Sequence, residues 1–265
     1  MFKVACIQLK SNDNIKRNFE KTKRIIIKAI KQKADFILTP EVSSLFSLNK
    51  KKLLSISTSM EDDFYLKGIK KLARDYKKWI LIGSLIIKIK NNKLVNRSVL
   101  VSSRGKIHSY YDKIHMYDAT LSKNEKYHES KTFLPGKIYK IAKLPWGKLG
   151  MSICFDLRFP NLYRKLSQSG CLFLSVPSAF TETTGKKHWH TLLKARAIEN
   201  FSYIFAPAQG GTHYNGRKTF GHSLIISPDG KILKELKKKE GFITAEIDPN
   251  FSKKLRKAIP SLNID

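Results

Sequence analysis

Short apolar segments typical of β-strands alternate with amphipathic segments along the whole chain, and this alternation limits the possible folds most strongly. Phe2–Leu9 and Phe36–Thr39 are strand-like, and Asn14–Gln32 between them carries apolar residues at helical spacing. Trp79–Ile89 and Leu94–Val101 follow as two strands around a short turn, which is typical of an antiparallel meander. The pattern predicts an α/β fold that includes antiparallel strands.

The rest of the chain continues this alternation, and no change of composition marks a linker, so we expect one domain over residues 1–265. Tyr117–Gly136 has little periodicity and is expected to form a long loop. The turn Pro228–Gly230 is expected to join the strands Gly221–Ser227 and Phe242–Ile247 in a hairpin. The other predicted elements are an extended basic tail at Lys253–Asp265, strands at Ile107–Tyr111, Ile138–Leu144, Cys171–Val176 and Tyr203–Ala208, and helices at Glu61–Lys77, Pro160–Gln168 and His188–Asn200.

A formal net charge of +30 raises the question of a nucleic-acid partner. Of the 51 basic residues, 41 are Lys spread over nearly every segment, and ten are Arg, the residue best suited to bidentate phosphate contacts. We therefore expect solvated lysine surfaces and no specific nucleic-acid binding. No apolar run approaches the roughly 20 residues that span a membrane. Cys6, Cys154 and Cys171 are scattered and no export signal precedes them, so we expect reduced thiols in the cytoplasm.

Cys154 lies where a predicted strand is followed by a predicted helix. Leu149–Ile153 is small and apolar, and Pro160 is suited to the first turn of a helix. The positive end of a helix dipole favours the thiolate, which is the nucleophilic form of cysteine. Buried structural cysteines are common, so this stretch by itself fits either a nucleophile or a core residue.

Three ionisable residues, Glu41, Lys113 and Cys154, lie just after predicted strands. Ligands of open α/β sheets bind at the carboxyl ends of strands, so these side chains are candidates for one site. A carboxylate that accepts the thiol proton, a thiolate that attacks a carbonyl and an ammonium group that stabilises the oxyanion would together catalyse acyl transfer. Each residue taken singly also has a structural interpretation: Glu41 could cap a helix, Lys113 could be a surface lysine and Cys154 could be a core residue.

Segments around all three residues resemble the nitrilase superfamily of carbon–nitrogen hydrolases. The likeness runs in order and at the expected spacing from Phe2 to about Pro260. The matching segments are Thr39–Glu41, Tyr111–Asp118, Ile153–Pro160, Pro177–Phe180, His188–Trp189, Lys194–Asn200 and Gly221–Ser223.

The resemblance implies a nitrilase-like four-layer α-β-β-α sandwich with two mixed sheets, assembled as a homodimer or a higher homo-oligomer. It implies a triad of Glu41 as general base, Lys113 as stabiliser of the oxyanion and Cys154 as nucleophile. Glu129 corresponds to a second catalytic glutamate, and the backbone N–H of Phe155 would complete the oxyanion hole. Neither a metal ion nor an organic cofactor is expected.

Other ionisable residues are expected to serve the structure. Asp156 and Arg158 would stabilise the turn after Cys154, and Arg196 can pair with Glu199 three residues further on. The spacing of the histidines is not the tight spacing of a zinc site. The histidines considered are His115, His128, His188 and His222.

The implied activity is hydrolysis of a non-peptide amide bond, and the chain looks most similar to amidases of deaminated glutathione and to ω-amidase. The Gly-rich loop Ala208–His222 favours the former, and its Arg217 can bind a substrate carboxylate bidentately, unless the loop is only a mobile surface segment. His213 and Phe180 are further candidates for substrate contact. The alternatives are ω-amidase, another aliphatic amidase or N-carbamoyl hydrolase and, in a different class, a basic nucleic-acid-binding protein on an inactive hydrolase fold.

Overall fold

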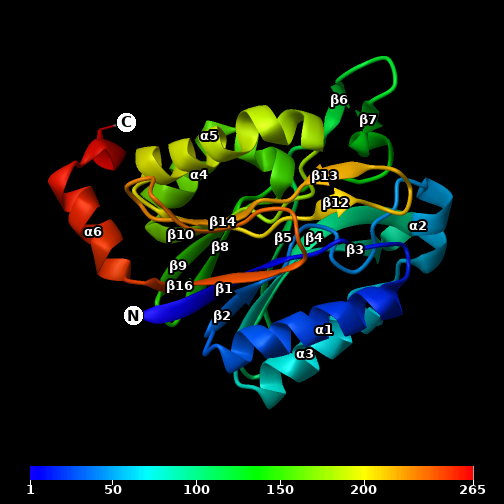
Figure 1. Cartoon of the computed structure of the whole chain (residues 1–265), viewed down its shortest axis with the longest axis horizontal. Coiled ribbons are helices and arrows are strands. Elements are labelled where there is room, and N and C mark those ends of the chain that lie inside the picture. Colours follow the sequence, from blue (N-terminus) through cyan, green and yellow to red (C-terminus); the bar gives the residue numbers. More distant parts are fainter. Residues whose placement is uncertain (265) are drawn as a thin grey trace.

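Two six-stranded mixed sheets lie face to face, and helices cover both outer faces (Figure 1). The computed structural model describes residues 1–264. The helices α1 (Ile15–Lys31) and α3 (Phe64–Asp75) cover the first sheet, and α4 (Pro160–Gln168) and α5 (Glu182–Asn200) cover the second. The predicted α-β-β-α sandwich with two mixed sheets is confirmed.

The first sheet contains, in spatial order, β16 (Gly241–Ile247), β1 (Phe2–Gln8), β2 (Phe36–Leu38), β3 (Trp79–Ile89), β4 (Lys93–Val101) and β5 (Ile107–Asp112). The strands β1, β2 and β3 are parallel. The strands β4 and β5 continue from β3 as the predicted antiparallel meander. At the other edge, β16 pairs antiparallel with β1, so distant parts of the chain lie side by side.

The second sheet contains, in spatial order, β15 (Ile232–Leu236), β14 (Ser223–Ile226), β11 (Tyr203–Ala206), β10 (Cys171–Ser175), β9 (Gly147–Met151) and β8 (Lys140–Leu144). The strands β9, β10 and β11 are parallel, and the flanking pairs are antiparallel. Each sheet therefore has three parallel strands at its centre. The segments that follow such strands are where an α/β fold gathers functional groups.

The strand β1 shows how one sequence pattern serves two packed layers. Phe2, Val4 and Cys6 belong to the buried cluster between the sheets, whereas Ala5 and Ile7 belong to the cluster between the first sheet and its helices. This alternation follows from the pleat, which directs successive side chains to opposite faces. Both faces of the strand are apolar because both are covered.

The C-terminal tail is helical, so the prediction of an extended tail was wrong. The helix α6 (Pro249–Ala258) begins after Asp248, whose side chain accepts a hydrogen bond from the Asn250 N–H. The Arg256 guanidinium donates to the backbone oxygen of Asn200 over 3.0 Å, which ties α6 to the end of α5. The signals for a helix start are present in the sequence but lie in a lysine-rich segment with little apolar periodicity.

The turn Pro228–Gly230 joins β14 to β15, so its predicted pairing with Phe242–Ile247 was wrong. That later segment forms β16 and pairs with β1 in the other sheet. The strand β15 lies at an edge, contains Lys234 and Glu235, and has no buried residue. It therefore lacks the apolar alternation by which a strand is recognised in sequence.

The segment Tyr117–Gly136 was predicted as a loop but contains short regular elements. It forms a small hairpin of β6 (Asp118–Thr120) and β7 (Lys126–His128), which projects from the body of the molecule, followed by η2 (Glu129–Lys131) (Figure 1). The remaining elements are α2 (Lys50–Ile56), β12 (Gly210–Thr212), β13 (Lys218–Phe220), and the short helices η1 (Lys90–Asn92), η3 (Cys154–Arg158) and η4 (Ser261–Asn263).

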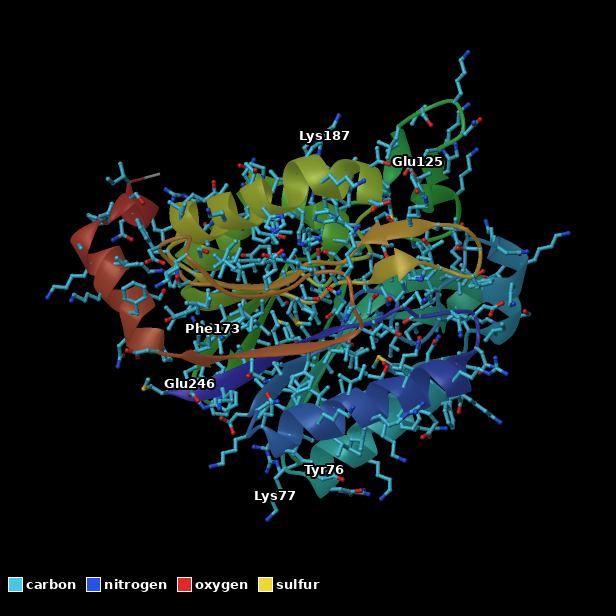
Figure 2. The ribbon with its side chains drawn as sticks, viewed as in Figure 1. Tyr76, Lys77, Glu125, Phe173, Lys187 and Glu246 are labelled. Atoms are coloured by element: carbon cyan, nitrogen blue, oxygen red, sulfur yellow. The ribbon has the colours of Figure 1, made fainter. Side chains whose placement is uncertain are left out.

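The lysines are distributed mainly over the outside. Figure 2 shows Phe173 between the two sheets, whereas Lys77 and Lys187 extend away from the molecule. Among residues 1–264, Lys113 is the one lysine with a buried side chain. None of the helices in that range has the length and apolarity needed to cross a membrane.

Candidate active site

Glu41, Lys113, Glu129 and Cys154 line one cavity of about 380 Å³. Glu41 lies shortly after β2, Lys113 directly after β5 and Cys154 shortly after β9, while Glu129 begins η2. The structure thus brings together four residues that sequence analysis assigned to one catalytic site. The volume is within the usual range for small-molecule sites.

The backbone that carries Glu41 is fixed by close contacts from both sheets. Gly83 in β3 approaches so closely that a Cβ atom there would lie 2.0 Å from the Thr39 carbonyl oxygen. The Gln209 side-chain amide, from beyond β11, donates to the Glu41 backbone oxygen over 2.9 Å. Val42 is left-handed, with φ of 48°, which turns the chain immediately after the carboxylate.

The Glu41 carboxylate is buried and accepts three hydrogen bonds. Lys113 Nζ and Asn96 Nδ2 each donate to Oε1 over 3.0 Å, and the Ala179 N–H donates to Oε2 over 2.8 Å. Burial by itself would raise the pKa of Glu41, but the charge and hydrogen bond of Lys113 outweigh burial, so the pKa lies below its usual value. Glu41 is therefore ionised at neutral pH.

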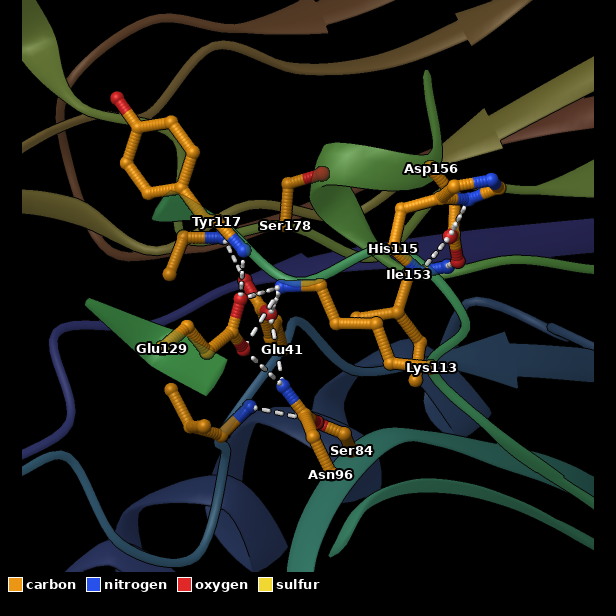
Figure 3. Close-up of polar contacts among 12 residues, drawn as sticks. Glu41, Ser84, Asn96, Lys113, His115, Tyr117, Glu129, Ile153, Asp156 and Ser178 are labelled. Carbon is orange, nitrogen blue, oxygen red and sulfur yellow. Dashed lines mark hydrogen bonds and ion pairs between the residues drawn. The ribbon is translucent and has the colours of Figure 1, made fainter. Parts of the chain in front are cut away.

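Lys113 lies between two carboxylates (Figure 3). Its Nζ is 3.0 Å from Glu41 Oε1 and 2.9 and 2.8 Å from the two oxygens of Glu129. Burial opposes the charge of Lys113, but the two glutamates outweigh burial and raise its pKa. The Tyr117 N–H donates to Glu129 Oε2 over 2.6 Å, which fixes the second carboxylate. The site therefore presents a permanently charged ammonium group at a fixed position.

Asn96, which the sequence analysis missed, connects the two carboxylates. Its Nδ2 donates to Glu41 over 3.0 Å and to Glu129 over 3.3 Å, and its backbone oxygen accepts from the Lys113 N–H over 2.9 Å. The residue is buried in β4 and lines the cavity. A single asparagine within a strand carries no local signal, so only the strand pairing brings it to the site.

Cys154 begins η3 in a left-handed conformation, with φ of 48°. Its N–H donates to the Pro177 oxygen over 2.9 Å, and the Asp156 N–H donates to the Ile153 oxygen over 3.1 Å. The Phe155 N–H between them donates no hydrogen bond within residues 1–264. An uncommitted N–H beside the thiol is suited to an oxyanion.

The thiol of Cys154 is held in its neutral form. Burial is the largest cause that raises its pKa, and the charge of Glu41 raises it further, while Lys113 lowers it. Any preference for the thiolate that the helix dipole provides is therefore outweighed in the resting protein. The helix η3 has only five residues, and desolvation of the thiolate dominates. The thiol needs a base when it attacks, and Glu41 is the carboxylate beside it.

Asp156 joins the segment of Lys113 to the segment of Cys154, as the predicted structural role requires. Its buried carboxylate accepts hydrogen bonds from the Tyr111 hydroxyl and the Ile153 N–H, both over 2.8 Å, and from the His115 N–H over 3.1 Å. The His115 ring nitrogen Nδ1 lies 2.7 Å from the same carboxylate. This cluster lies behind the reacting groups and takes no part in lining the cavity.

Arg217 reaches the cavity from the Gly-rich loop. Its guanidinium lies 5.2 Å from the ring centre of Phe46 and 5.1 Å from that of Tyr127, and Nη2 donates to the Ala179 oxygen over 3.0 Å. Its buried Nε has no hydrogen-bond partner within residues 1–264. The loop is thus anchored at Arg217, whose side chain lines the cavity.

His213 is not brought into the cavity, so the predicted substrate contact is not supported by its position. Its ring nitrogens lie 2.8 Å from the Ser11 oxygen and 2.7 Å from Thr219 Oγ1, and the ring stacks on Phe46. Burial lowers the pKa of His213 to about 4, so it is neutral. Its role in the structure is to hold the base of the Gly-rich loop.

Phe180 lies near the thiol but outside the main cavity. It lines a small hollow with Cys154 and Phe155, and the Arg158 guanidinium lies 5.1 Å from its ring centre. Its ring also contacts Trp189 of α5 at 5.1 Å between centroids. Phe180 therefore shapes the wall behind the nucleophile.

A thiol, an ionised carboxylate and a fixed ammonium group in an α-β-β-α sandwich define the class of the molecule as a hydrolase of nitrilase fold. The carbon–nitrogen hydrolase family model matches residues 3–257, and the chain belongs to that family. Membership of this family makes the chain a carbon–nitrogen hydrolase.

Individual relatives agree with this assignment. A deaminated glutathione amidase of Synechocystis sp. is 37% identical over 266 residues, which cover 98% of this chain and 96% of the relative. The crystal structure of the Caenorhabditis elegans NitFhit protein is 32% identical with a TM-score of 0.93, covering all of this chain and 65% of that one. Saccharomyces cerevisiae Nit3, a member of branch 10 of the nitrilase superfamily, is 27% identical with a TM-score of 0.88, over 98% of this chain and 94% of its own.

Proposed function

We propose that this protein hydrolyses a linear amide that carries a carboxylate, such as deaminated glutathione, through an acyl-enzyme on Cys154. The observation that carries the proposal is the buried arrangement of Glu41, Lys113 and Glu129 beside that thiol in one cavity. Acyl transfer needs a nucleophile, a base and a stabiliser of the oxyanion, and each is present with the required charge.

In the first half of the reaction, Glu41 accepts the proton of Cys154 as the sulfur attacks the amide carbon. The carbonyl oxygen becomes an oxyanion, which the Lys113 ammonium group and the Phe155 N–H stabilise. Protonated Glu41 then gives its proton to the leaving nitrogen, the carbon–nitrogen bond breaks, and an amine or ammonia departs. A thioester remains on Cys154.

In the second half, Glu41 acts again as the base. It accepts a proton from water as the water oxygen attacks the thioester carbon, and Lys113 again faces the oxyanion. The carbon–sulfur bond breaks, the sulfur recovers the proton, and a carboxylic acid leaves. Glu129 touches Lys113 and not the thiol, which supports a role in holding the ammonium group in place.

The charges around the cavity support a substrate with a carboxylate. The cavity is lined by four cations, Lys50, Lys126, Lys131 and Arg217, together with the two glutamates. Since Lys113 neutralises part of the charge of the glutamates, the outer cations are available to a substrate anion. The name of the Synechocystis relative supports deaminated glutathione as the particular substrate.

The proposal includes a homodimer in the cytoplasm. The homodimer rests on the resemblance to the nitrilase superfamily, and the cytoplasm on the three free cysteines. We expect light scattering of the protein in solution to give the mass of a dimer. A monomer mass at all protein concentrations would contradict the homodimer.

The test is a panel of amides assayed with the wild type and two cysteine variants. Deaminated glutathione is expected to be the best substrate, ahead of an ω-amide, an N-carbamoyl amino acid and a neutral aliphatic amide. Cys154→Ala is expected to lose all turnover, whereas Cys171→Ala, which alters a buried strand residue, is the matched control and keeps it. Equal loss in both folded variants would contradict the assignment of the nucleophile. Preference for the neutral amide would contradict the substrate class.

A further inference from the structure

His190, His222 and Glu235 form a cluster on the outer side of the second sheet, remote in sequence from one another. His190 is on α5, His222 lies between β13 and β14, and Glu235 is on β15. His190 Nε2 and His222 Nδ1 lie 3.1 Å and 2.6 Å from Glu235 Oε1. Each residue offers one ligand atom, and all three atoms lie within 4.8 Å of one another. The spacing of histidines along the chain gave no sign of this arrangement.

The donor set matches a borderline divalent metal ion. Imidazole nitrogen and carboxylate oxygen are ordinary ligands of Zn²⁺, at about 2.0–2.2 Å. Ligands at the corners of a tetrahedron of that size lie about 3.3 Å apart. The 3.1 Å contact of His190 with Glu235 is close to that spacing, and the 2.6 Å contact of His222 has to lengthen by about 0.7 Å. The three side chains are 34%, 16% and 28% exposed, so water can supply a fourth ligand. Two nitrogen donors disfavour Mg²⁺ and Ca²⁺, which prefer oxygen.

The His222 ring is held in place by its surroundings. The ring stacks on Phe220 with centroids 4.2 Å apart, and the His222 N–H donates to the Lys237 oxygen over 2.8 Å. Its own backbone oxygen accepts from Trp189 Nε1 over 2.8 Å. Little side-chain entropy therefore remains to be lost when the ring binds a ligand.

We propose that His190, His222 and Glu235 bind one divalent transition-metal ion of the zinc type. Each imidazole uses the lone pair of the nitrogen that faces Glu235, and its proton moves to the other ring nitrogen. The ion replaces the two contacts to the carboxylate by three metal–ligand bonds and links α5, β15 and the segment before β14. The proposal does not depend on the proposed amidase mechanism.

The site lies behind one wall of the cavity. The strand β13 joins Arg217 to the segment of His222, and the Phe220 N–H donates to the Phe180 oxygen over 2.9 Å. An ion that ties His222 to α5 and β15 therefore stabilises this wall without contacting Cys154. Its expected effect is on the stability of the fold.

The experiment uses the full chain after treatment with a chelator, titrated with Zn²⁺ by calorimetry and with Co²⁺ by visible absorption. The wild type is expected to bind one ion per chain, to show the intense absorption of four-coordinate Co²⁺, and to melt several degrees higher with Zn²⁺. His190→Ala and Glu235→Gln are expected to weaken binding about 100-fold. His222→Asn, which tolerates the left-handed φ of 55° at that position, is expected to do the same.

Two controls separate this site from other histidines and from the cavity. His188→Ala changes a histidine on the same helix that contacts Arg158 instead, and it is expected to bind as the wild type does. Cys154→Ala removes the thiol and is also expected to bind Zn²⁺ normally. Loss of binding in either control, equal binding in Glu235→Gln and the wild type, or equal binding of Mg²⁺ would overturn the proposal.

Discussion

Two buried polar clusters meet at the segment of Lys113 but differ in how their charges are balanced. In the cavity, the Lys113 ammonium group lies between the carboxylates of Glu41 and Glu129 and forms an ion pair with each. Behind the cavity, the Asp156 carboxylate has four polar contacts. They come from Tyr111 and His115 on the segment of Lys113 and from Ile153 on the segment of Cys154. The first cluster faces the cavity, and the second is closed to it.

The difference separates chemistry from positioning. The cavity cluster keeps an anion and a cation within reach of the Cys154 thiol, so small changes there alter charge at the reacting atoms. The Asp156 cluster fixes where Lys113 and Cys154 stand relative to each other. Misplacement of reacting groups by about 1 Å can cost on the order of 10²-fold in rate. Variants in the two clusters are therefore expected to differ in their effects on rate, pH dependence and stability.

The largest effect is expected from Lys113. Lys113→Ala leaves two buried carboxylates without their cation, and kcat is expected to fall by about 10²–10³. Lys113→Arg keeps the charge but replaces a compact ammonium group by a larger planar one, so we expect it to be nearly as damaging. The matched control is Lys126→Arg, which alters a lysine at the cavity lining without contact to either glutamate. Steady-state assays that show more than a tenth of wild-type turnover in Lys113→Arg would exclude the oxyanion role.

A smaller loss of rate with a larger loss of stability is expected from Asp156→Asn. In this variant an NH₂ group replaces one carboxylate oxygen and faces groups that themselves donate hydrogen bonds. Hydrogen bonds to a charged group contribute about 1.5–3 kcal/mol each, and these are lost or weakened. We expect the free energy of unfolding to fall by about 3 kcal/mol and kcat to fall about tenfold with KM little changed. Urea unfolding and kinetics measure the two effects. Asp229→Asn, in the turn before β15, is the control and should alter neither by much; wild-type behaviour of Asp156→Asn would contradict the positioning role.

Asn96 is expected to affect pH dependence. The Glu41 pKa is lowered in the folded protein, so its active anionic form is lost only as the pH falls through that lowered value. Asn96→Asp adds a negative charge beside both glutamates and raises the Glu41 pKa. The acid limb of kcat/KM should therefore move to higher pH, by about one unit, whereas Asn96→Ala should move it less. If the acid limb of the kcat/KM profile is unchanged in Asn96→Asp, Glu41 is not the base whose titration sets that limb.

The smallest effect is expected from Arg217. Arg217→Gln should raise KM for a carboxylate-bearing amide about tenfold, the value of one charge-assisted hydrogen bond, and leave a neutral amide unaffected. Lys218→Gln, at the adjacent exposed position, is the matched control. A KM increase of the same size for both substrates would show that Arg217 only anchors the loop.

Much of the fold was predictable because apolar strands and amphipathic helices carry periodic signals. The three parallel strands β1, β2 and β3 and the meander after them were recognised from such runs. The strand β15 and the helix α6 were not, because they lie at the surface with charged residues and little apolar periodicity. Pairing partners in different sheets are set by tertiary packing, and for this reason the strand beside β14 was assigned wrongly.

The site was predictable where a residue follows a strand in a distinctive local context. Glu41, Lys113 and Cys154 are of that kind, and the cavity brings them together. Asn96 lacks a local signal, and the state of the thiol depends on burial and on Glu41, neither of which a sequence displays. His213 does not line the cavity, because nearness along a loop does not determine which side chains turn inward.

Cys154 is proposed to form the acyl-enzyme, and trapping that adduct is the decisive experiment. Wild type and Glu129→Gln are mixed with substrate, quenched in acid within one turnover and digested, and the peptides are weighed by mass spectrometry. We expect the acyl mass on the peptide that contains Cys154 and no such mass after Cys154→Ala. We expect the adduct to persist longer in Glu129→Gln, because misplacement of Lys113 slows hydrolysis of the thioester. Full turnover with no adduct, or an adduct on Cys6 or Cys171, would contradict it.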